Sequence, residues 1–301
     1  MPSIVAQREL LEDLRRRFAA APHLSADPLG VVVGYADPED QEIAAFVAAA
    51  FAYGRVEGVI ASARRILEAL GEHPARGLRE GRHRAGRFLP GFRHRWNGEE
   101  DVRGLCEAAA RAWELHGSLG GALLARRRDA ADFETALARW VGDLRGFAGE
   151  VVPLSRGLRF LLPDPVLGGT CKRWRLFLRW MIRPADGMDL GHWNAMLSPS
   201  ELLLPLDAHW TRIGPRLGWT RRRTPGRGMA ADLTAALRRI APEDPLRYDF
   251  AICHLGITGA CPPRLETRHC MACPLSPFCA TGRRRLRRAG ARLLEPGERV
   301  G

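Results

Sequence analysis

Apolar side chains recur along this chain with the period of an α-helix. The stripe is clearest over residues 43–51 and 56–70, where apolar positions follow the i, i+3, i+4, i+7 spacing. It returns in three later segments, 102–113, 133–144 and 229–240. Residues 30–33 alone look like a strand, and one short strand makes no sheet. The pattern therefore predicts an all-α protein.

Segments without a helical period separate the predicted helices. They are residues 71–98, 154–170, 184–206, 219–228 and the chain after residue 256. No apolar run reaches the roughly 18 residues of a membrane span. Charges are scattered through the first thirty residues, where a secretory signal would carry an apolar block. We therefore expect a cytoplasmic protein with no membrane partner.

Composition adds a strong cationic bias. The chain has 46 basic and 34 acidic side chains and a net charge of +12. Three clusters hold many of the arginines: Arg82, Arg84, Arg87, Arg93 and Arg95, with Phe88, Phe92 and Trp96 among them; Arg221, Arg222, Arg223 and Arg227; and Arg283, Arg284, Arg285, Arg287 and Arg288. Any single cluster fits an ordinary solvated surface. Together they favour a nucleic-acid partner, whose phosphates attract arginine.

Seven cysteines, an odd number, argue against a disulfide framework in a chain of this kind. Four of them, Cys261, Cys270, Cys273 and Cys279, have the spacing C-x8-C-x2-C-x5-C. Four thiolates in one short loop suit a 4Fe-4S cluster. Zinc is the alternative, and His254 or His269 would be an additional zinc ligand. We expect Cys106 and Cys253 to be helix-core residues.

Lys172 is the one lysine among the 46 basic residues. It follows Gly168, Gly169 and Thr170 and precedes an apolar-rich segment, which describes a turn that enters a helix. Thr170 is the expected N-cap, and Lys172 falls at about the second helical position. A helix N-terminus disfavours a cation, so the neutral, nucleophilic amine is favoured there. The alternative is that Lys172 has no special function and that one lysine remains in the sequence by chance.

Asp207 stands between a loop and an amphipathic segment. An acid in that place is often an N-cap, which is the ordinary interpretation of an isolated aspartate. The other interpretation, a catalytic carboxylate, rests on a family resemblance.

These motifs resemble the endonuclease III superfamily of helix-hairpin-helix DNA glycosylases. The cysteine spacing, residues 249–256 and Cys273-Pro274-Leu275 look like that family's C-terminal region. The segment from Gly168 to Lys172 is similar to its hairpin, and Asp207-Ala208-His209 to its Asp-x-His segment. Leu167 and Thr170 depart from the hairpin's proline and second glycine.

A longer lysine-to-aspartate separation, with residues 184–204 as an apparent insertion, resembles the archaeal 8-oxoguanine glycosylases. Three strings, 171–173, 177–183 and 189–193, resemble most closely a bacterial family named domain of unknown function 2400. That resemblance spans nearly the whole chain. The name carries no activity.

The glycosylase resemblance implies a two-lobed all-α fold with a C-terminal four-cysteine metal-cluster loop. Residues 40–190 would form a helical barrel with the Lys-bearing hairpin, and residues 1–39 plus 200–301 the lobe with the cluster. The implied activity is that of a bifunctional DNA glycosylase and AP lyase. It would remove a damaged base, with an oxidised, 8-oxoguanine-like base as the candidate, through a Schiff base on Lys172, with Asp207 as the catalytic carboxylate. Lys172 and Asp207 would lie in the cleft between the lobes.

The partner implied is double-stranded DNA that contains a damaged base, bound by a nucleoid-associated monomer. The expected DNA contacts are Gly168, Gly169, Thr170, Arg173, His209, Tyr53, Arg55, Arg221, Arg222 and Arg223. The 4Fe-4S ligands would be the four cysteines from Cys261 to Cys279. Two rivals are a non-catalytic nucleic-acid-binding protein with a structural iron–sulfur or zinc site, and a zinc-stabilised interaction module.

Excision of a base requires that the nucleotide leave the stack, which takes a wedge and a pocket. Tyr53-Gly54-Arg55, between two predicted helices, is the candidate wedge, although an ordinary interhelical turn also explains it. Four tryptophans are candidates for stacking on the base or, alternatively, for core packing: Trp174, Trp180, Trp193 and Trp210.

Overall fold

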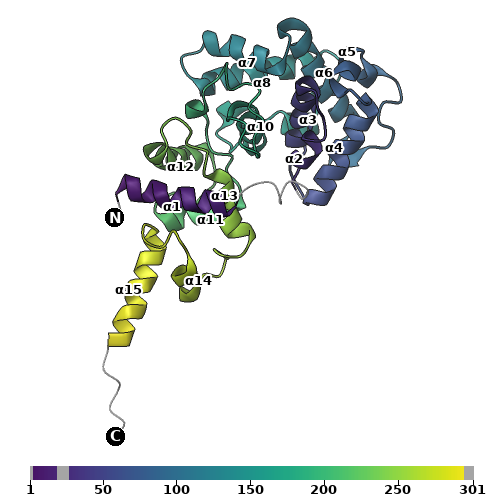
Figure 1. Ribbon diagram of the computed structural model, residues 1–301. Helices are drawn as coiled ribbons and strands as arrows, with labels where there is room; N and C mark the ends of the chain where they lie inside the picture. Colours follow the sequence, from purple (N-terminus) through teal and green to yellow (C-terminus); the bar gives the residue numbers. More distant parts are fainter. Residues whose placement is uncertain (1–2, 19–26, 295–301) are drawn as a thin grey trace. The chain divides into compact units, whose positions relative to one another are not determined.

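The computed structural model describes residues 3–18 and 27–294, and it is almost entirely helical. This part of the chain forms fifteen α-helices, three short 3-10 helices and one two-stranded hairpin (Figure 1). The prediction of an all-α protein is confirmed at this level. None of the described helices combines the length and the apolar character that crossing a bilayer requires.

The chain divides into two compact units. One comprises the described part of residues 20–205, called the central unit here. The other, the terminal unit, combines the N-terminal helix with the described residues from Leu206 onward. The predicted barrel of residues 40–190 lies within the central unit, and its division from a metal-bearing lobe stays a prediction.

The central unit contains a succession of helices and one small hairpin. Its α-helices are α2 Leu29–Val32, α3 Pro38–Ala50, α4 Val56–Leu70, α5 Pro74–Arg79, α6 Glu99–His116, α7 Leu119–Arg128, α8 Phe133–Gly149, α9 Arg156–Leu161 and α10 Lys172–Ile182. Its 3-10 helices are η2 Arg82–Arg84, η3 Pro165–Leu167 and η4 Pro199–Glu201. Strands β1 Arg93–His94 and β2 Asn97–Gly98 pair antiparallel. Helix α6 packs against α7 and α8, and α10 packs against α3.

Aromatic rings hold α10 in the core of the central unit. Phe177 of α10 lies 5.7 Å from Phe46 of α3 and 5.1 Å from Trp193, measured between ring centroids. Trp174, one turn earlier, lies 5.1 Å from Trp140 of α8. One face of α10 is therefore buried along its length, which fixes how its first turn is presented.

A buried carboxylate joins three segments of this unit. Glu42 of α3 accepts hydrogen bonds from the indole N–H groups of Trp113 and Trp193, at 2.7 and 2.8 Å. It also accepts from the backbone N–H groups of Leu119 and Gly120, at 3.0 and 3.2 Å, at the start of α7. Trp193 belongs to the stretch that looks like an insertion in the sequence. That stretch is thus part of the core.

The terminal unit contains the remaining helices: α1 Ile4–Arg17, α11 Ala208–Leu217, α12 Arg227–Ile240, α13 Asp249–Ile257, α14 Thr267–Ala272 and α15 Ala280–Leu294. Helix α1 lies beside α12 and α13 (Figure 1). Glu12 of α1 accepts a hydrogen bond from Tyr248 at 2.8 Å and pairs with Arg247 at 2.8 Å. The N-terminal helix therefore packs with segments more than 200 residues away along the chain.

Two local predictions were wrong. Residues 30–33 are not a strand, because Leu29–Val32 forms helix α2, whose apolar residues are buried and whose first turn is capped by the Asp27 side chain. The valine run suggested a strand, and tertiary burial overrides that local preference. Segments expected to be irregular also contain helices: α5, α9, α14 and α15.

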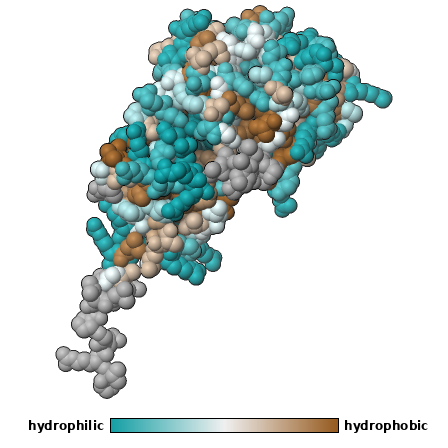
Figure 2. Space-filling view, in the orientation of Figure 1, coloured by the Kyte–Doolittle hydropathy of each residue, from teal (hydrophilic) through white to brown (hydrophobic). Residues whose placement is uncertain are grey.

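The surface in Figure 2 is mostly hydrophilic, with apolar side chains gathered in small patches. Among the described residues, few large hydrophobic side chains are more than 70% exposed: Val166, Leu167 and Met271. Val166 and Leu167 are neighbours in η3.

Candidate functional site

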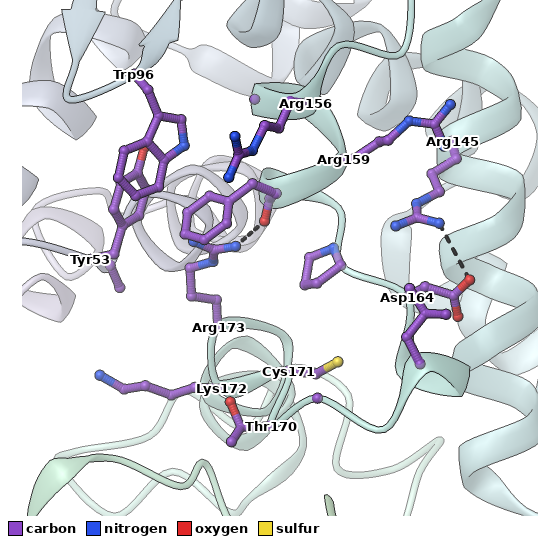
Figure 3. Close-up of a pocket in the computed structure, with 16 residues that line it drawn as sticks. Tyr53, Trp96, Arg145, Arg156, Arg159, Asp164, Thr170, Cys171, Lys172 and Arg173 are labelled. Carbon is purple, nitrogen blue, oxygen red and sulfur yellow. Dashed lines mark hydrogen bonds and ion pairs between the residues drawn. The ribbon is translucent and has the colours of Figure 1, made fainter. Parts of the chain in front are cut away.

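A large pocket of the central unit surrounds the start of α10. Its volume is about 1030 Å³. Side chains from α9, the β1–β2 turn, η3 and the α3–α4 connection line it together with the first residues of α10 (Figure 3). Five of the lining side chains are basic: Arg145, Arg156, Arg159, Lys172 and Arg173. The one acidic lining residue is Asp164, so the pocket is strongly cationic.

Lys172 is the first residue of α10. The residue before it, Cys171, is the N-cap and has φ 44° and ψ 36°, in the left-handed region. The prediction that Thr170 caps the helix with its side chain was wrong, because no side chain caps this helix. A buried non-glycine residue in this conformation costs about 1 kcal/mol or more, so neighbouring contacts must impose it.

Arg175 supplies those contacts. Its backbone N–H donates to the Cys171 carbonyl at 3.1 Å, and its Nε donates to the Thr170 carbonyl at 3.0 Å. Its two terminal nitrogens donate to the two carboxylate oxygens of Glu134 in α8, each at 2.8 Å. The first turn of α10 is therefore tied to α8 on one side.

The Lys172 side chain is half-buried and lines the pocket. Figure 3 shows it leaving the first turn of α10 on a different side from Arg173. Within the described residues, its ammonium group makes no hydrogen bond or ion pair. The amine is thus held at the pocket by its helix and is not engaged by a carboxylate.

Three aromatic rings form one wall of the pocket. Trp96 stacks on Tyr53, with ring centroids 5.5 Å apart and planes 27° apart. Phe160 of α9 meets both rings edge to face, at 5.0 and 4.9 Å. The Tyr53 hydroxyl donates to the side-chain oxygen of Asn97, and burial raises the pKa of Tyr53 to about 12. Tyr53 is therefore a fixed, neutral part of the wall.

Arg173 is a buried cation that pairs with no carboxylate in the described part of the chain. It is 8% exposed, and its guanidinium donates to the carbonyl of Phe160. Its central carbon lies 3.8 Å from the ring centroid of Phe160 and 5.1 Å from that of Tyr53. Burial lowers the pKa of Arg173 to about 10. Arg173 therefore belongs to the pocket wall, and its expected role in DNA binding stays a prediction.

The other lining charges differ in how they are engaged. Arg145 donates to the Leu162 carbonyl at 2.8 Å and pairs with Asp164 at 3.3 Å. Arg159 donates to the Leu154 carbonyl at 3.0 Å. Arg156 is exposed and has no such contact among the described residues. An anionic ligand would meet Arg156, Arg159 and Lys172 without displacing an acid.

The glycines before α10 face open space. Gly168 has φ +73°, which favours glycine, and a Cβ placed on Gly168 or Gly169 would touch nothing within 4 Å. Thr170 is half-buried and lines the pocket with Gly169. The backbone here is open to a close approach by a ligand.

The candidates for base stacking in the sequence lie in the core. Trp174, Trp180 and Trp193 are each 2% exposed and Trp210 is not exposed, so core packing is their role. The residue that sequence reasoning missed is Trp96, half exposed at the β1–β2 turn. Trp96 belongs to the arginine cluster with interleaved aromatic side chains, and that pattern could have identified it as a binding residue. No sequence pattern identifies Phe160.

Asp207 lies in the terminal unit as the N-cap of α11. Its Oδ1 accepts from the backbone N–H of Trp210 at 2.7 Å, so it does cap a helix. Its Oδ2 lies 3.6 Å from the sulfur of Cys253, which is also 3.6 Å from Asp249 Oδ1. Cys253 is partly exposed and faces two carboxylates, which differs from the apolar helix-core position expected for it.

The remaining expected DNA contacts have different settings. His209 packs on α13, where a Cβ at Gly256 would lie 2.3 Å from its Nδ1. Arg55 is exposed before α4. Arg221, Arg222 and Arg223 are exposed before α12, and Arg222 pairs with Asp232 at 3.1 Å. These positions are open to a partner, and their role in DNA binding stays a prediction.

The four clustered cysteines line one small cavity of the terminal unit. The cavity has a volume of about 30 Å³ and includes Cys261, Cys270, Cys273 and Cys279 in its lining. Burial raises the pKa of Cys273 to about 11, and the like charges of the other three thiolates add to the rise. Arg216 Nη1 lies 3.2 Å from the Cys261 sulfur. The four thiols thus line one cavity, and a metal cluster held by them stays a prediction.

Of the alternative zinc ligands, His269 lines this cavity, and its Nδ1 accepts from the Glu266 backbone N–H at 3.1 Å. His254 is not among the lining residues, and it stacks on Phe250 with ring centroids 3.8 Å apart. In the described residues, no three His, Cys, Asp or Glu side chains form a ready-made metal site. The donor set is soft and compact, which suits iron–sulfur or zinc.

Comparison with known proteins gives one relationship. Searches of the curated proteins and of the solved structures find no match to the chain. A family model matches residues 27–258, which include Lys172, the pocket and Asp207 and end before Cys261. The chain belongs to the family described as protein of unknown function (DUF2400).

Proposed function

We propose that this protein is a DNA glycosylase with AP lyase activity that acts through Lys172. The observation that carries the proposal is the Lys172 amine itself. It stands at the first residue of a helix, lines a large pocket with aromatic and cationic walls, and has no acidic partner among the described residues. An amine in that setting is available to attack an electrophilic carbon.

The pocket suits a nucleotide that has left the duplex. Trp96 and Phe160 offer ring faces and edges on which a base stacks, at a value of about 1–3 kcal/mol per base. Arg156 and Arg159 on the rim are placed to meet the phosphates on either side of the extruded nucleotide. A strongly cationic pocket with an aromatic wall therefore favours a nucleotide over a neutral apolar ligand.

The chemistry follows from the amine. The neutral nitrogen of Lys172 attacks the anomeric carbon, and the glycosidic bond breaks as its electron pair leaves with the base, which takes up a proton. Opening of the sugar ring then gives a protonated Schiff base between Lys172 and that carbon. Loss of the neighbouring C2′ proton and of the 3′ phosphate completes the strand nick by β-elimination.

Asp207 would stabilise the positive charge that develops on the sugar. Capping α11 occupies its Oδ1, and Oδ2 faces the thiol of Cys253. The assignment of Asp207 rests on its resemblance to the Asp-x-His segment of the glycosylase superfamily. The same resemblance is the basis for an oxidised, 8-oxoguanine-like base as the substrate.

The four cysteines from Cys261 to Cys279 would hold a 4Fe-4S cluster, or zinc as the alternative. When bound, such a group cross-links the loop and supplies structural stability. Backbone hydrogen bonds already fold the loop, from Cys261 to Leu255 at 2.6 Å and from Cys279 to Leu275 at 2.9 Å. Ligation would draw the four sulfurs together from that starting arrangement.

A second candidate is a non-catalytic nucleic-acid-binding protein. One observation favours it: Asp207 has a complete structural role as the N-cap of α11, so its presence does not require catalysis. In that case the arginines and the pocket would bind an extrahelical nucleotide without cleaving it.

Borohydride trapping separates the two candidates. The protein is incubated with duplex oligonucleotides that carry an abasic site or one of a panel of oxidised bases, and sodium borohydride reduces any Schiff base to a stable cross-link. We expect a cross-linked species with the wild-type protein, loss of at least 95% of it in Lys172→Gln, and unchanged affinity for the abasic duplex. Since Lys172 is the one lysine in the sequence, the adduct has one lysine to form on.

Arg156→Gln is the matched control, because it removes a cation from the same pocket and leaves the amine. It should weaken DNA binding and keep the cross-link at saturating protein. The catalytic proposal fails if wild-type protein gives no cross-link with any of these substrates, and Lys172 loses its role if Lys172→Gln still cross-links.

A further inference from the structure

An apolar pair stands exposed at the edge of the Lys172 pocket. Val166 is 72% exposed and Leu167 is 80% exposed, and Leu167 is one of the residues that line the pocket. Because burial of apolar side chains is favourable, the exposure of two adjacent ones needs an explanation.

The turn that carries the pair is firmly built. Asp164 Oδ1 accepts from the Val166 backbone N–H at 2.9 Å, and Asp164 Oδ2 pairs with Arg145 at 3.3 Å. Pro165 is buried and begins the 3-10 helix η3, which ends at Gly168 in the left-handed region. The backbone thus holds the two apolar side chains outward on a capped, anchored turn.

The surroundings of the pair indicate what it contacts. Arg156, Arg159 and Lys172 line the same pocket, and the open backbone of Gly168 and Gly169 follows directly. A protein partner or a second copy would need a wide apolar face, and two side chains among cations do not provide one. Bases stacked between phosphates offer an apolar slot flanked by negative charge, which complements this edge.

From this we propose that Val166 and Leu167 form the wedge that enters the base stack of double-stranded DNA when a nucleotide moves into the Lys172 pocket. Apolar side chains of this size separate base steps in other DNA-binding proteins. The inference rests on the proposed function and goes beyond it by assigning the residues that open the duplex.

This assignment replaces Tyr53-Gly54-Arg55 as the wedge. The Tyr53 hydroxyl is bonded to Asn97, and its ring is packed between Trp96, His94 and Phe160. A side chain held in that way is part of the pocket wall and does not extend into a duplex.

Fluorescence of 2-aminopurine tests the wedge without catalysis. The probe is a duplex with 2-aminopurine beside a tetrahydrofuran abasic site, which resists cleavage. Its emission rises when neighbouring bases unstack. We expect saturating wild-type protein to raise the emission at least threefold, and a Val166→Ala, Leu167→Ala double variant to lose most of that rise. Its Kd, from fluorescence anisotropy, should change by less than about fivefold.

Leu115→Ala is the matched control, because Leu115 is an exposed leucine of α6, 54% exposed, that does not line the pocket. It should behave as wild type. Equal melting temperatures of the variants show that none has lost its fold.

The wedge is overturned if the wild-type protein binds without raising the emission, or if the double variant raises it fully. These outcomes are independent of borohydride trapping on an abasic duplex. A rise in emission without a cross-link refutes the lyase activity and supports the wedge. A cross-link without a rise in emission supports the lyase activity and refutes the wedge.

Discussion

Arg173 and Arg175, two residues apart on α10, should respond to the same substitution in opposite ways. Both guanidinium groups are buried, at 8% and 2% exposure. Arg175 pairs with both carboxylate oxygens of Glu134, at 2.8 Å each. Arg173 has only the Phe160 carbonyl and two aromatic faces. Replacement of each by methionine therefore compares an unpaired buried charge with a paired one.

The magnitude for Arg173 follows from its burial. A pKa lowered to about 10, from the ordinary value above 12, corresponds to a cost of about 3 kcal/mol for keeping the cation in the fold. Methionine removes that cost. It also removes one hydrogen bond, worth about 1 kcal/mol, and the contact with the ring faces, worth about 1 kcal/mol. We expect Arg173→Met to unfold with a free energy about 1 kcal/mol above that of wild type.

Replacement of Arg175 by methionine should instead lower the free energy of unfolding. Its loss leaves Glu134 without the arginine that it pairs with and leaves the Thr170 carbonyl without its donor. Removing one partner of a buried pair costs about 3–5 kcal/mol. The two variants should therefore differ by about 4–6 kcal/mol, a gap that is much larger than the error of either value.

Chemical denaturation followed by circular dichroism at pH 7.5 measures the gap. The lowered pKa of Arg173 means that its cost is present in full below about pH 10 and is relieved only as the pH rises through that value, so pH 7.5 samples all of it. The reasoning is refuted if Arg173→Met loses as much stability as Arg175→Met.

The buried charge of Arg173 also bears on function. A cation that the fold keeps at a cost is typical of a binding site, where a ligand supplies the missing counter-charge. Arg173→Met should therefore weaken binding to an abasic duplex at least tenfold while it leaves the fold intact. Equal affinity in wild type and variant would place Arg173 outside the ligand's reach.

Two further predictions concern other sites. Burial alone would raise the pKa of Glu107, but hydrogen bonds from Arg84 and His83 outweigh it and hold the pKa below its ordinary value. A lowered pKa stabilises the fold above pH 4.5, and the effect fades as the pH falls. Glu107→Gln should therefore lose about 2 kcal/mol at pH 7 and less at pH 3, in denaturation at both values; an equal loss at both contradicts the ion pairs. Cys270→Ser should lose bound iron or zinc in metal analysis by mass spectrometry, whereas Cys253→Ser should retain it, and retention by both variants would exclude the four-cysteine site.

The sequence predicted the parts of this fold that depend on one helix at a time. The stripes over 43–51, 56–70, 102–113, 133–144 and 229–240 all lie in helices of the structure, because each buries one face against neighbours. The helix that starts near Lys172 was predictable for the same reason, since glycines and then apolar residues mark its beginning.

The walls of the pocket could not be predicted in that way. Trp96, Phe160 and Arg173 come from a hairpin turn, a short helix and α10, and only the tertiary fold brings them together. The sequence offered Trp174 as a residue for base stacking and did not single out Trp96. The difference is that Trp140 and Phe46 cover Trp174, and a sequence does not show which rings will meet.

The position of Lys172 changes the meaning of the arginine-rich composition. With one lysine in the chain, positive charge is supplied almost everywhere by a group that stays protonated. The one side-chain amine lies at a helix start and lines a large pocket of the central unit, and among the described residues it makes no hydrogen bond or ion pair. Arg173, the next residue, would bind an anion as well as lysine does, so phosphate attraction alone does not account for an amine at this position. What an amine adds to an arginine is the capacity to lose its proton and form a bond to carbon, and that capacity is what the proposed reaction requires.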